Sequence, residues 1–386
     1  MAEGPRSVLM VLEATFPAHG GGGAESQVLT LSRALADRGV RVRLVAPRVP
    51  GGPQAARENV DGLEVVRIAY PRVHLFGGLI LLAKLAAYLV RHRRDYSVIH
   101  AHIAHNMASV CALVGRMLGK PVFVKITGPH ELVGGILDPN PDLASRLRKA
   151  AILRATTMHA ISGRIRQVLI DRGFKAERVL WLPNGVDTNR FSRRPREAAL
   201  RAKLCGDARL VGVCAARLVA EKDHELLLHA WSDALGKSSD VKLVLVGDGV
   251  LREPLRDLAA RLGITDQVVF AGHADDVAPY LSIADFALLT SRGEGLSNSL
   301  LEYMAMGLPV VGSRVSGTED YVVTGQTGWL FESGRRDELA RALATVGAAA
   351  ETELRRIGDE ARNRILTTAS VDAVTREWIR RYGFAS

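Results

Sequence analysis

The sequence predicts an α/β protein built from two domains, and three observations support this prediction. Short apolar runs typical of buried strands alternate along the chain with glycine-containing turns and segments of helical periodicity. A length of 386 residues is enough for two domains of ordinary size, each with its own core. An apolar fraction of 47% and a charged fraction of 24% are typical of a globular protein.

In the first half of the chain, strands and helices are expected in alternation. Apolar runs predict strands at residues 7–12, 40–45, 63–68, 98–102, 121–126 and 158–162, and periodicity predicts helices at 24–38, 147–157 and 164–172. Residues 47–61 are rich in Gly and Pro and predict a loop. Residues 75–90 are apolar on nearly every side with Lys84 as the only charge, so this helix either packs inside the domain or touches a membrane.

Three histidines, His100, His102 and His105, lie within six residues. Their spacing suits no single helical face, and no nearby cysteine or pair of carboxylates completes a ligand set. We therefore expect no metal site there.

The compartment is expected to be the cytosol. The first apolar run, 8–12, is too short for a signal peptide, and the longest, 75–90, is shorter than a membrane span. Cys111, Cys205 and Cys214 are odd in number and lack metal-ligand spacing, so they are expected to be reduced core residues.

The positive charge is concentrated in the first half. Residues 1–189 contain 25 Lys and Arg against 14 Asp and Glu, a net charge of +11, whereas the remainder carries −1. The clusters at 91–94 and 146–149 either face anionic lipid or glycan or form a solvated basic surface. No nucleic-acid-binding motif accompanies the charge, so nucleic acid is not an expected partner.

In the second half, strands are expected at 210–215, 241–246, 268–272 and 286–289, a turn and strand at 325–330, and helices at 336–349 and 371–382. Arg217 and Lys222 follow the first of these strands, where a forked guanidinium and a point charge are suited to clamp a diphosphate. A solvated pair of cations is the alternative. The second strand runs into the turn Gly247-Asp248-Gly249.

The stretch 290–312, TSRGEGLSNSLLEYMAMGLPVVG, predicts a loop, a helix from about 297 to 306, and a further strand at 309–311. The amides of residues 296–300 are expected at a helix N-terminus, whose first donors suit a phosphate. Glu302 lies eight residues, about two helical turns, after Glu294, so the two carboxylates can bracket the hydroxyls of one ligand. A capped surface helix with two solvated acids is the alternative.

The block E-G-L-S-N-S-L-L-E-x-M-A-x-G-L-P-V-V around Glu294 resembles the donor-binding signature of the retaining glycosyltransferases of family 4. P-N-G-V-D-x-x-x-F from Pro183 and R-L-x-x-E-K from Arg217 resemble the interdomain connection and the phosphate-binding cations of the same family. The resemblance implies the GT-B architecture, two doubly wound Rossmann-like domains facing each other across a cleft. The implied limits are an acceptor-side domain at 1–189, a donor-binding domain at 190–368, and a helix at 369–386 that crosses back to the first domain.

The resemblance also implies roles for individual residues. Donor binding is implied for Gly22, Gly23, Arg217, Lys222, Gly247, Asp248, Gly295, Leu296, Ser297, Asn298, Ser299, Leu300 and Glu302. Within this set Glu302 is expected to hold the ribose hydroxyls, while Glu294 is expected to act in catalysis on the transferred sugar. The family's active-site histidine has no match after the strand 121–126, because Thr127 occupies its position. Either His130 from a longer loop is the catalytic candidate, or the role is absent and Lys125 contributes the positive charge.

The sequence therefore predicts a retaining, metal-independent glycosyltransferase without a cofactor. It is expected to move a sugar from a UDP- or GDP-sugar to the hydroxyl of a glycan or lipid-linked acceptor, in bacterial polysaccharide, lipopolysaccharide or glycolipid synthesis. Peripheral contact of the basic first half with an anionic membrane is one of two interpretations left open, the other being a solvated surface. Two alternatives are a nucleotide-sugar epimerase of the same architecture and a scaffold protein that binds the donor but has lost transfer. The altered histidine position favours the scaffold, and the complete E-x7-E block argues against the epimerase.

Overall fold

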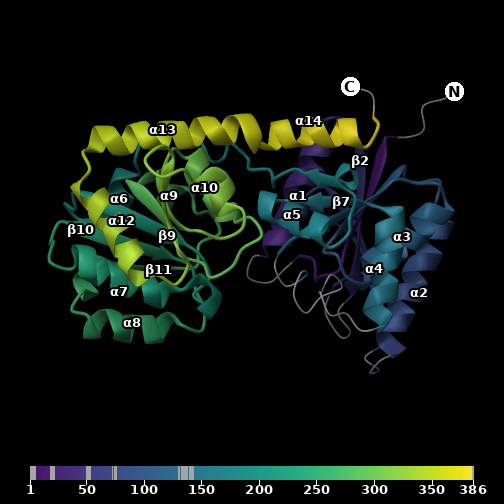
Figure 1. The fold of residues 1–386 in the computed structure, drawn as a ribbon, viewed down its shortest axis with the longest axis horizontal. Coiled ribbons are helices and arrows are strands. Elements are labelled where there is room, and N and C mark those ends of the chain that lie inside the picture. The colour runs from purple at the N-terminus through teal and green to yellow at the C-terminus, as the bar shows by residue number, and fades with distance from the viewer. Residues whose placement is uncertain are drawn as a thin grey trace. The chain divides into compact units, whose positions relative to one another are not determined.

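The computed structural model describes residues 6–17, 22–48, 54–71, 73, 76–128, 131, 138 and 143–384. By its internal contacts the chain divides into two compact units, unit 1 with residues 1–185 and 371–386, and unit 2 with residues 186–370. These limits differ by a few residues from the boundaries after 189 and 368 that the sequence suggests. Each unit is a layer of strands covered by helices (Figure 1).

Unit 1 contains, among its described residues, an eight-stranded sheet of order β3-β4-β2-β1-β5-β6-β7-β8. The strands are β1 (Ser7–Leu12), β2 (Arg41–Arg48), β3 (Arg57–Val60), β4 (Leu63–Ala69), β5 (Val98–His102), β6 (Val122–Ile126), β7 (Thr157–Ala160) and β8 (Val179–Trp181). The chain winds outward from β1 to β2 and β4, then returns to place β5 on the other side of β1. Except for the pair of β3 with β4, the strand pairs are parallel, so the apolar strands are buried on both faces.

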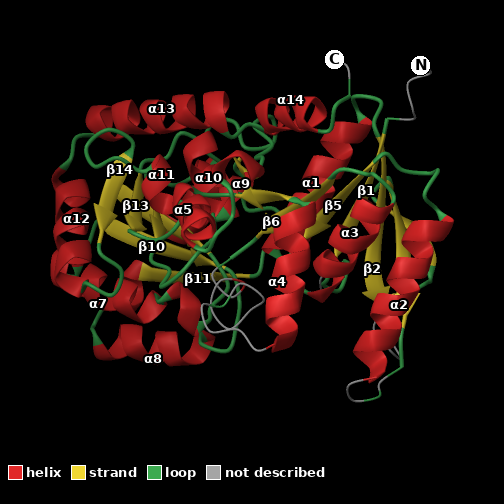
Figure 2. Cartoon of the chain, turned by 45° about the vertical axis from the view of Figure 1, so that its right-hand side comes forward, coloured by secondary structure: helices red, strands yellow, loops and turns green. Residues whose placement is uncertain are grey.

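The helices of unit 1 cover both faces of this sheet. They are α1 (Gly23–Ala36), α2 (Phe76–Arg91), α3 (Asn106–Met117), α4 (Leu143–Ala155), α5 (Gly163–Asp171), the 3-10 turn η2 (Ala176–Arg178) and α14 (Val371–Arg381). α2, α3 and α4 pack side by side, and α14 packs against α1 (Figure 2). Among the described residues, no helix has both the length and the apolar character needed to cross a membrane.

The expectation of a loop throughout residues 47–61 was wrong, because residues 57–60 form β3. β3 pairs antiparallel with β4 through the two-residue turn Asp61-Gly62. Both turn residues have positive φ, 51° and 88°, as the tight hairpin turn with a right-handed twist requires. The Asp-Gly pair between two short strands was the signal that the Gly/Pro-rich composition concealed.

Unit 2, which is described throughout, contains a six-stranded parallel sheet of order β11-β10-β9-β12-β13-β14. The strands are β9 (Leu210–Ala215), β10 (Val241–Val246), β11 (Val268–Gly272), β12 (Phe286–Leu289), β13 (Val310–Ser313) and β14 (Gly328–Phe331). The helices are α6 (Ala198–Cys205), α7 (His224–Leu235), α8 (Arg252–Arg261), α9 (Ala278–Ser282), α10 (Asn298–Ala305), α11 (Thr318–Tyr321), α12 (Arg336–Ala348) and α13 (Glu351–Thr368), with 3-10 turns η3 (Ala220–Lys222) and η4 (Thr265–Gln267). α7 packs between α8 and α12, while α10 packs against α13 (Figure 1).

A cluster of buried histidines lies between the sheet of unit 1 and α14. His102 and His159 flank Lys125 in register across β5, β6 and β7, and His100 precedes His102 on the same face. The ring of His100 lies 4.4 Å from that of His102 and 4.5 Å from that of Trp378, and its Nδ1 is 2.7 Å from the hydroxyl of Tyr382. Burial lowers the pKa of all three histidines well below 6.5 and lowers the pKa of Lys125 to about 8.

We predict that unit 1 loses stability as the pH falls below 6.5. The unfolded chain takes up protons on these histidines at a higher pH than the folded chain does, so the free energy of unfolding falls by up to about 1.4 kcal/mol per pH unit for each histidine. Hydrogen exchange of the β5 amides at pH 7.5 and 5.5, corrected for intrinsic rates, measures the loss. His102→Leu should weaken the pH dependence, whereas the control His273→Leu, at an exposed site in unit 2, should not. Equal protection at both pH values would contradict the prediction.

Candidate active site

The candidate site of unit 2 lies where the direction of winding reverses. The chain proceeds from β9 to β10 and β11 on one side, then returns so that β12 lies on the other side of β9. In doubly wound sheets, ligands bind beyond the carboxyl ends of the strands at this reversal. The loop after β9 carries Arg217 and Lys222, and the loop after β12 carries Glu294, so the sheet topology brings the sequence-predicted residues together.

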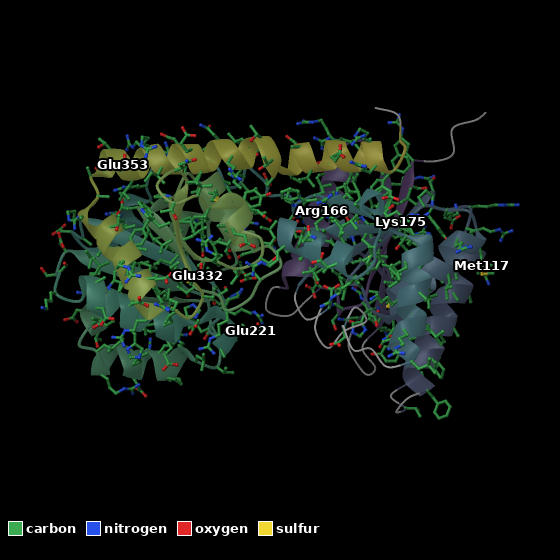
Figure 3. The ribbon with its side chains drawn as sticks, viewed as in Figure 1. Met117, Arg166, Lys175, Glu221, Glu332 and Glu353 are labelled. Carbon is green, nitrogen blue, oxygen red and sulfur yellow. The ribbon has the colours of Figure 1, made fainter. Side chains whose placement is uncertain are left out.

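Arg217 and Lys222 differ in how they are held. Lys222 ends η3, and its Nζ donates a hydrogen bond to Oε1 of Glu294, with only 19% of the lysine and 14% of the glutamate side chain exposed. Among the described residues, the one ion pair of Arg217 is with the exposed Glu221, labelled in Figure 3, at 3.9 Å. An exposed ion pair at this distance contributes little to stability, so the Arg217 guanidinium is available to an anionic ligand.

Hydrogen bonds hold Glu294 and the surrounding loop after β12 in place. The hydroxyl of Ser291 donates to Oε1 of Glu294 at 2.7 Å, and the hydroxyl of Thr290 donates to the carbonyl of Lys222 at 2.8 Å. The carbonyl of Ser291 in turn accepts a bond from the hydroxyl of Ser313 at 2.7 Å. Glu294 is therefore a positioned carboxylate, already neutralised by a cation.

Helix α10 follows this loop, as the sequence predicted, with Ser297 as its N-cap residue. Two side chains of the helix are anchored at the end of β9. The hydroxyl of Tyr303 accepts a bond from the amide of Ala215 at 2.6 Å and donates to its carbonyl at 3.1 Å, and the hydroxyl of Ser299 donates to the same carbonyl at 2.9 Å. Leu296 and Leu300 are buried, so they anchor the start of the helix.

Gly317 supports the turn that precedes α10. It has φ of 80°, and a Cβ built on it would lie 2.8 Å from the carbonyl oxygen of Gly295 and 2.8 Å from Cα of Leu296. The hydroxyl of Ser316 donates to the Gly295 carbonyl at 3.2 Å. The close approach of these two loops requires glycine at 317.

Glu302 contrasts with Glu294. It is half-buried on α10, and among the described residues no hydrogen bond or ion pair reaches its carboxylate. Burial raises the pKa of Glu302 to about 7, with Arg190 opposing the rise and Asp276 adding to it. A partly desolvated carboxylate without a donor is an acceptor prepared for the hydroxyl groups of a ligand.

Gly247 and Asp248 shape the loop after β10. Gly247 has φ of 140°, and a Cβ on it would lie 2.1 Å from the carbonyl oxygen of Ala216, so only glycine permits this approach to the Arg217 loop. The carboxylate of Asp248 accepts bonds from the Gly249 amide at 2.8 Å and from Arg252 at 3.2 Å. In this structure Asp248 organises its own turn.

In unit 1, Gly22 and Gly23 open helix α1. Gly22 is the N-cap residue, and the carboxylate of Glu25 fills the space beside it, since Oε2 would lie 1.8 Å from a Cβ at Gly22. An anion approaching this turn would therefore require Glu25 to move. His130 lies outside the described residues.

Glu131 is a residue that the sequence interpretation missed. It is fully buried, and its carboxylate accepts bonds from the amides of Thr127 at 2.6 Å and Gly128 at 3.0 Å, as well as from the amide of Ala104. It therefore joins the loops after β5 and β6. An acid next to the candidate His130 was the signal available in the sequence.

Within the described residues, no group of three or more His, Cys, Asp and Glu side chains is arranged to hold a metal ion.

Comparison with known proteins decides the family. Residues 21–190 match the model of Glycosyltransferase Family 4, and residues 209–348 match that of Glycosyl transferases group 1. The 2-deoxystreptamine N-acetyl-D-glucosaminyltransferase of Streptomyces fradiae is 30% identical over 356 residues, which span 86% of this chain and 83% of that protein. The chain belongs to glycosyltransferase family 4.

Further similarities agree with this family-4 assignment. The 2-deoxystreptamine glucosyltransferase of Streptomyces kanamyceticus is 28% identical over 345 residues, 83% of this chain and 88% of that protein. The crystal structure of Anabaena Alr3699/HepE in complex with UDP matches with a TM-score of 0.79 and 21% identity, over 98% of this chain and 99% of that chain. The two α/β units of this family-4 glycosyltransferase, each built on a sheet of mainly parallel strands, have the GT-B fold.

We predict that Tyr303→Phe destabilises unit 2 by about 1–3 kcal/mol, because the amide and the carbonyl of Ala215 both lose a buried partner. Chemical denaturation monitored through the buried Trp231 in unit 2 measures the change. The control is Tyr280→Phe, since the half-buried Tyr280 has no hydroxyl bond among the described residues. Equal stability of the two variants would contradict the proposed anchor.

Proposed function

We propose that this glycosyltransferase moves a sugar from a nucleoside-diphosphate sugar to an acceptor hydroxyl. The observation that carries the proposal is the pair of acids around the start of α10. Glu294 is fixed and neutralised by Lys222, whereas Glu302 presents a carboxylate with no partner among the described residues. A ligand with phosphates, ribose hydroxyls and sugar hydroxyls offers a partner to each of these groups. The phosphates suit the cations, the ribose hydroxyls suit Glu302, and the sugar hydroxyls suit Glu294. The UDP bound in the structural neighbour supports this ligand class.

The roles follow from the charges. Arg217, Lys222 and the amides of residues 296–300 take the diphosphate and stabilise the negative charge that develops on it as the leaving group. Glu302 accepts hydrogen bonds from the ribose hydroxyls. Glu294 holds the transferred sugar and supports positive charge at its anomeric carbon. Lys222 is shared between Glu294 and the diphosphate when the donor is bound.

We further propose that transfer proceeds with retention and without a metal ion or other cofactor. Two protein cations beside the diphosphate supply the charge that a divalent ion would otherwise supply. The anomeric configuration of the product, read by NMR, tests retention. Turnover in excess EDTA tests metal independence, because a metal-dependent enzyme would stop.

A donor-binding scaffold without transfer activity is the main alternative, and an epimerase of the same architecture is a second one. The ion pair between Lys222 and Glu294 favours the transferase, because a scaffold has no need to fix a carboxylate at the sugar position. Release of free sugar from the donor in the absence of acceptor distinguishes the transferase from the scaffold. Conversion of the donor to its epimer would identify the epimerase.

We predict that one of UDP, GDP, ADP, CDP and dTDP raises the melting temperature in EDTA, with UDP or GDP favoured. A ligand at a hundredfold excess over its Kd stabilises the folded state by about 2.7 kcal/mol. The double variant Arg217→Ala, Lys222→Ala should lose this shift. The control Lys237→Ala, Arg341→Ala, which removes two exposed cations elsewhere in unit 2, should keep it. If none of the five shifts the wild type, the donor proposal fails.

For the acceptor, we propose a glycan or lipid-linked molecule at an anionic membrane, as in surface-polysaccharide, lipopolysaccharide or glycolipid synthesis. The support is a face of unit 1 formed by α2, α3 and α4. Of the twelve large apolar side chains exposed in the described part of the chain, nine lie on or just before these helices. They are Val73, Phe76, Leu79, Ile80, Val90, Leu113, Met117, Leu143 and Leu147. Met117, at the end of α3 in Figure 3, is 80% exposed.

The charge of this face fits an anionic surface. Residues 76–120 contain six Lys and Arg but a single acid, Asp95, and α4 contains no acid. Apolar side chains flanked by cations are typical of segments that lie in the headgroup region of a membrane. A small hydrophilic acceptor would need no such face.

We predict that the protein sediments with vesicles containing phosphatidylglycerol at low salt and is released as salt rises. Replacing Arg91, Arg93 and Arg94 by Gln should weaken binding roughly a hundredfold, at about 1 kcal/mol per cation. Replacing Arg341, Arg355 and Arg356 of unit 2 by Gln removes the same charge elsewhere and should have little effect. Absence of sedimentation at low salt would refute the membrane contact.

A further inference from the structure

Asp223 has an unusual conformation at an important point of unit 2. It directly follows Lys222 and has φ of 51° and ψ of 44°, the left-handed region that residues other than glycine rarely adopt. Aspartate at the N-cap of a helix ordinarily bonds to the helix amides. Asp223 occupies this position in α7, yet its side chain caps no amide, although only 5% of it is exposed.

The carboxylate of Asp223 binds Arg292 instead. Nε and Nη2 of Arg292 donate to the two carboxylate oxygens at 2.9 and 3.0 Å, a forked pair in which each donor has its own acceptor. Arg292 lies two residues before Glu294, and its own amide donates to the carbonyl of Glu221 at 2.9 Å. One side-chain pair thus joins the residue after Lys222 to the loop that carries Glu294.

We propose that Asp223 and Arg292 are positioning residues for sugar transfer, which hold the Lys222 turn and the Glu294 loop in one fixed arrangement. The proposal rests on the donor-binding role proposed above for Lys222 and Glu294. Neither positioning residue needs to touch the donor. Backbone strain held in place by surrounding bonds is typical of functional sites, where it fixes reacting groups.

The physical reason is the flexibility of the groups that are being positioned. Lysine has four rotatable side-chain bonds, and Glu294 stands on a loop with glycine on both sides. A single ion pair between them would not define where a sugar and a diphosphate must sit. The forked pair, together with the bond from Thr290 to the Lys222 carbonyl, keeps the two backbones in register. A misplacement of about 1 Å in such a site lowers turnover up to roughly a hundredfold.

The chain contains a matched control for this pair. Arg336, at the start of α12, donates through Nε and Nη2 to both carboxylate oxygens of Asp233 on α7, each at 2.6 Å. The chemistry and fork geometry are the same, and both pairs involve α7. The control pair joins two helices and no loop of the candidate site.

The experiment compares kcat for donor hydrolysis and Kd for the nucleoside diphosphate in Arg292→Ala, Asp223→Gly and Arg336→Ala. Asp223→Gly removes the carboxylate but favours the left-handed backbone, so it isolates the ion pair. Both site variants are expected to lower kcat roughly ten- to a hundredfold. Their Kd should change less than threefold, because Arg217 and the helix amides still bind the diphosphate. Arg292→Lys should restore part of kcat through one of the two bonds.

An unchanged kcat in folded Arg292→Ala, or an equal fall of kcat in Arg336→Ala, would overturn the positioning role while leaving the donor proposal intact. A wild type that neither binds a nucleoside diphosphate nor hydrolyses any donor would refute the proposed function, and the positioning role with it. A fall in melting temperature without a fall in kcat would assign the pair to stability alone.

Discussion

The end of strand β9 fixes the geometry of the candidate site, because helix α10 is tied there to the backbone of a single residue. Tyr303 bonds to both the amide and the carbonyl of Ala215, which anchors α10 at the carboxyl edge of the sheet. Arg217 and Lys222 follow within the same loop, and the adjacent β12 leads into Glu294. Ligands of doubly wound sheets bind at such a reversal of winding, here between β9 and β12. Because α10 is held against the carboxyl edge of the sheet at this point, the helix forms one wall of the candidate site.

Glu294 and Glu302 have contrasting electrostatic environments, and the surrounding residues explain the difference. Glu294 is paired with a cation and a hydroxyl, so its charge is compensated before any ligand arrives. Glu302 is partly desolvated without a partner among the described residues, and burial raises its pKa to about 7. One acid is thus suited to a fixed role at a charged reaction centre, and the other to accepting neutral hydroxyl groups.

Much of the architecture could be predicted from the sequence, because buried parallel strands are continuous apolar runs and the helix after Glu294 has clear stop signals at Gly307 and Pro309. The hairpin of β3 was missed, since its strand is short and polar and only the Asp61-Gly62 turn marked it. The pair of Asp223 with Arg292 could not be predicted, because it depends on a left-handed aspartate that no local pattern indicates. The role of Glu131 likewise depends on loops that meet only in the folded unit.

Unit 1 is assembled from two segments of the chain, and this has a consequence for biosynthesis. Trp378 and Tyr382 are buried in its core, yet they are separated from the first 185 residues by the whole of unit 2. The hydrogen bond between His100 and Tyr382 spans 282 residues of chain. During synthesis the ribosome therefore completes unit 2 before it supplies the last helix of unit 1. Until then the aromatic and histidine surface under α14 is uncovered, and transiently exposed apolar surface of this kind favours aggregation of a nascent unit.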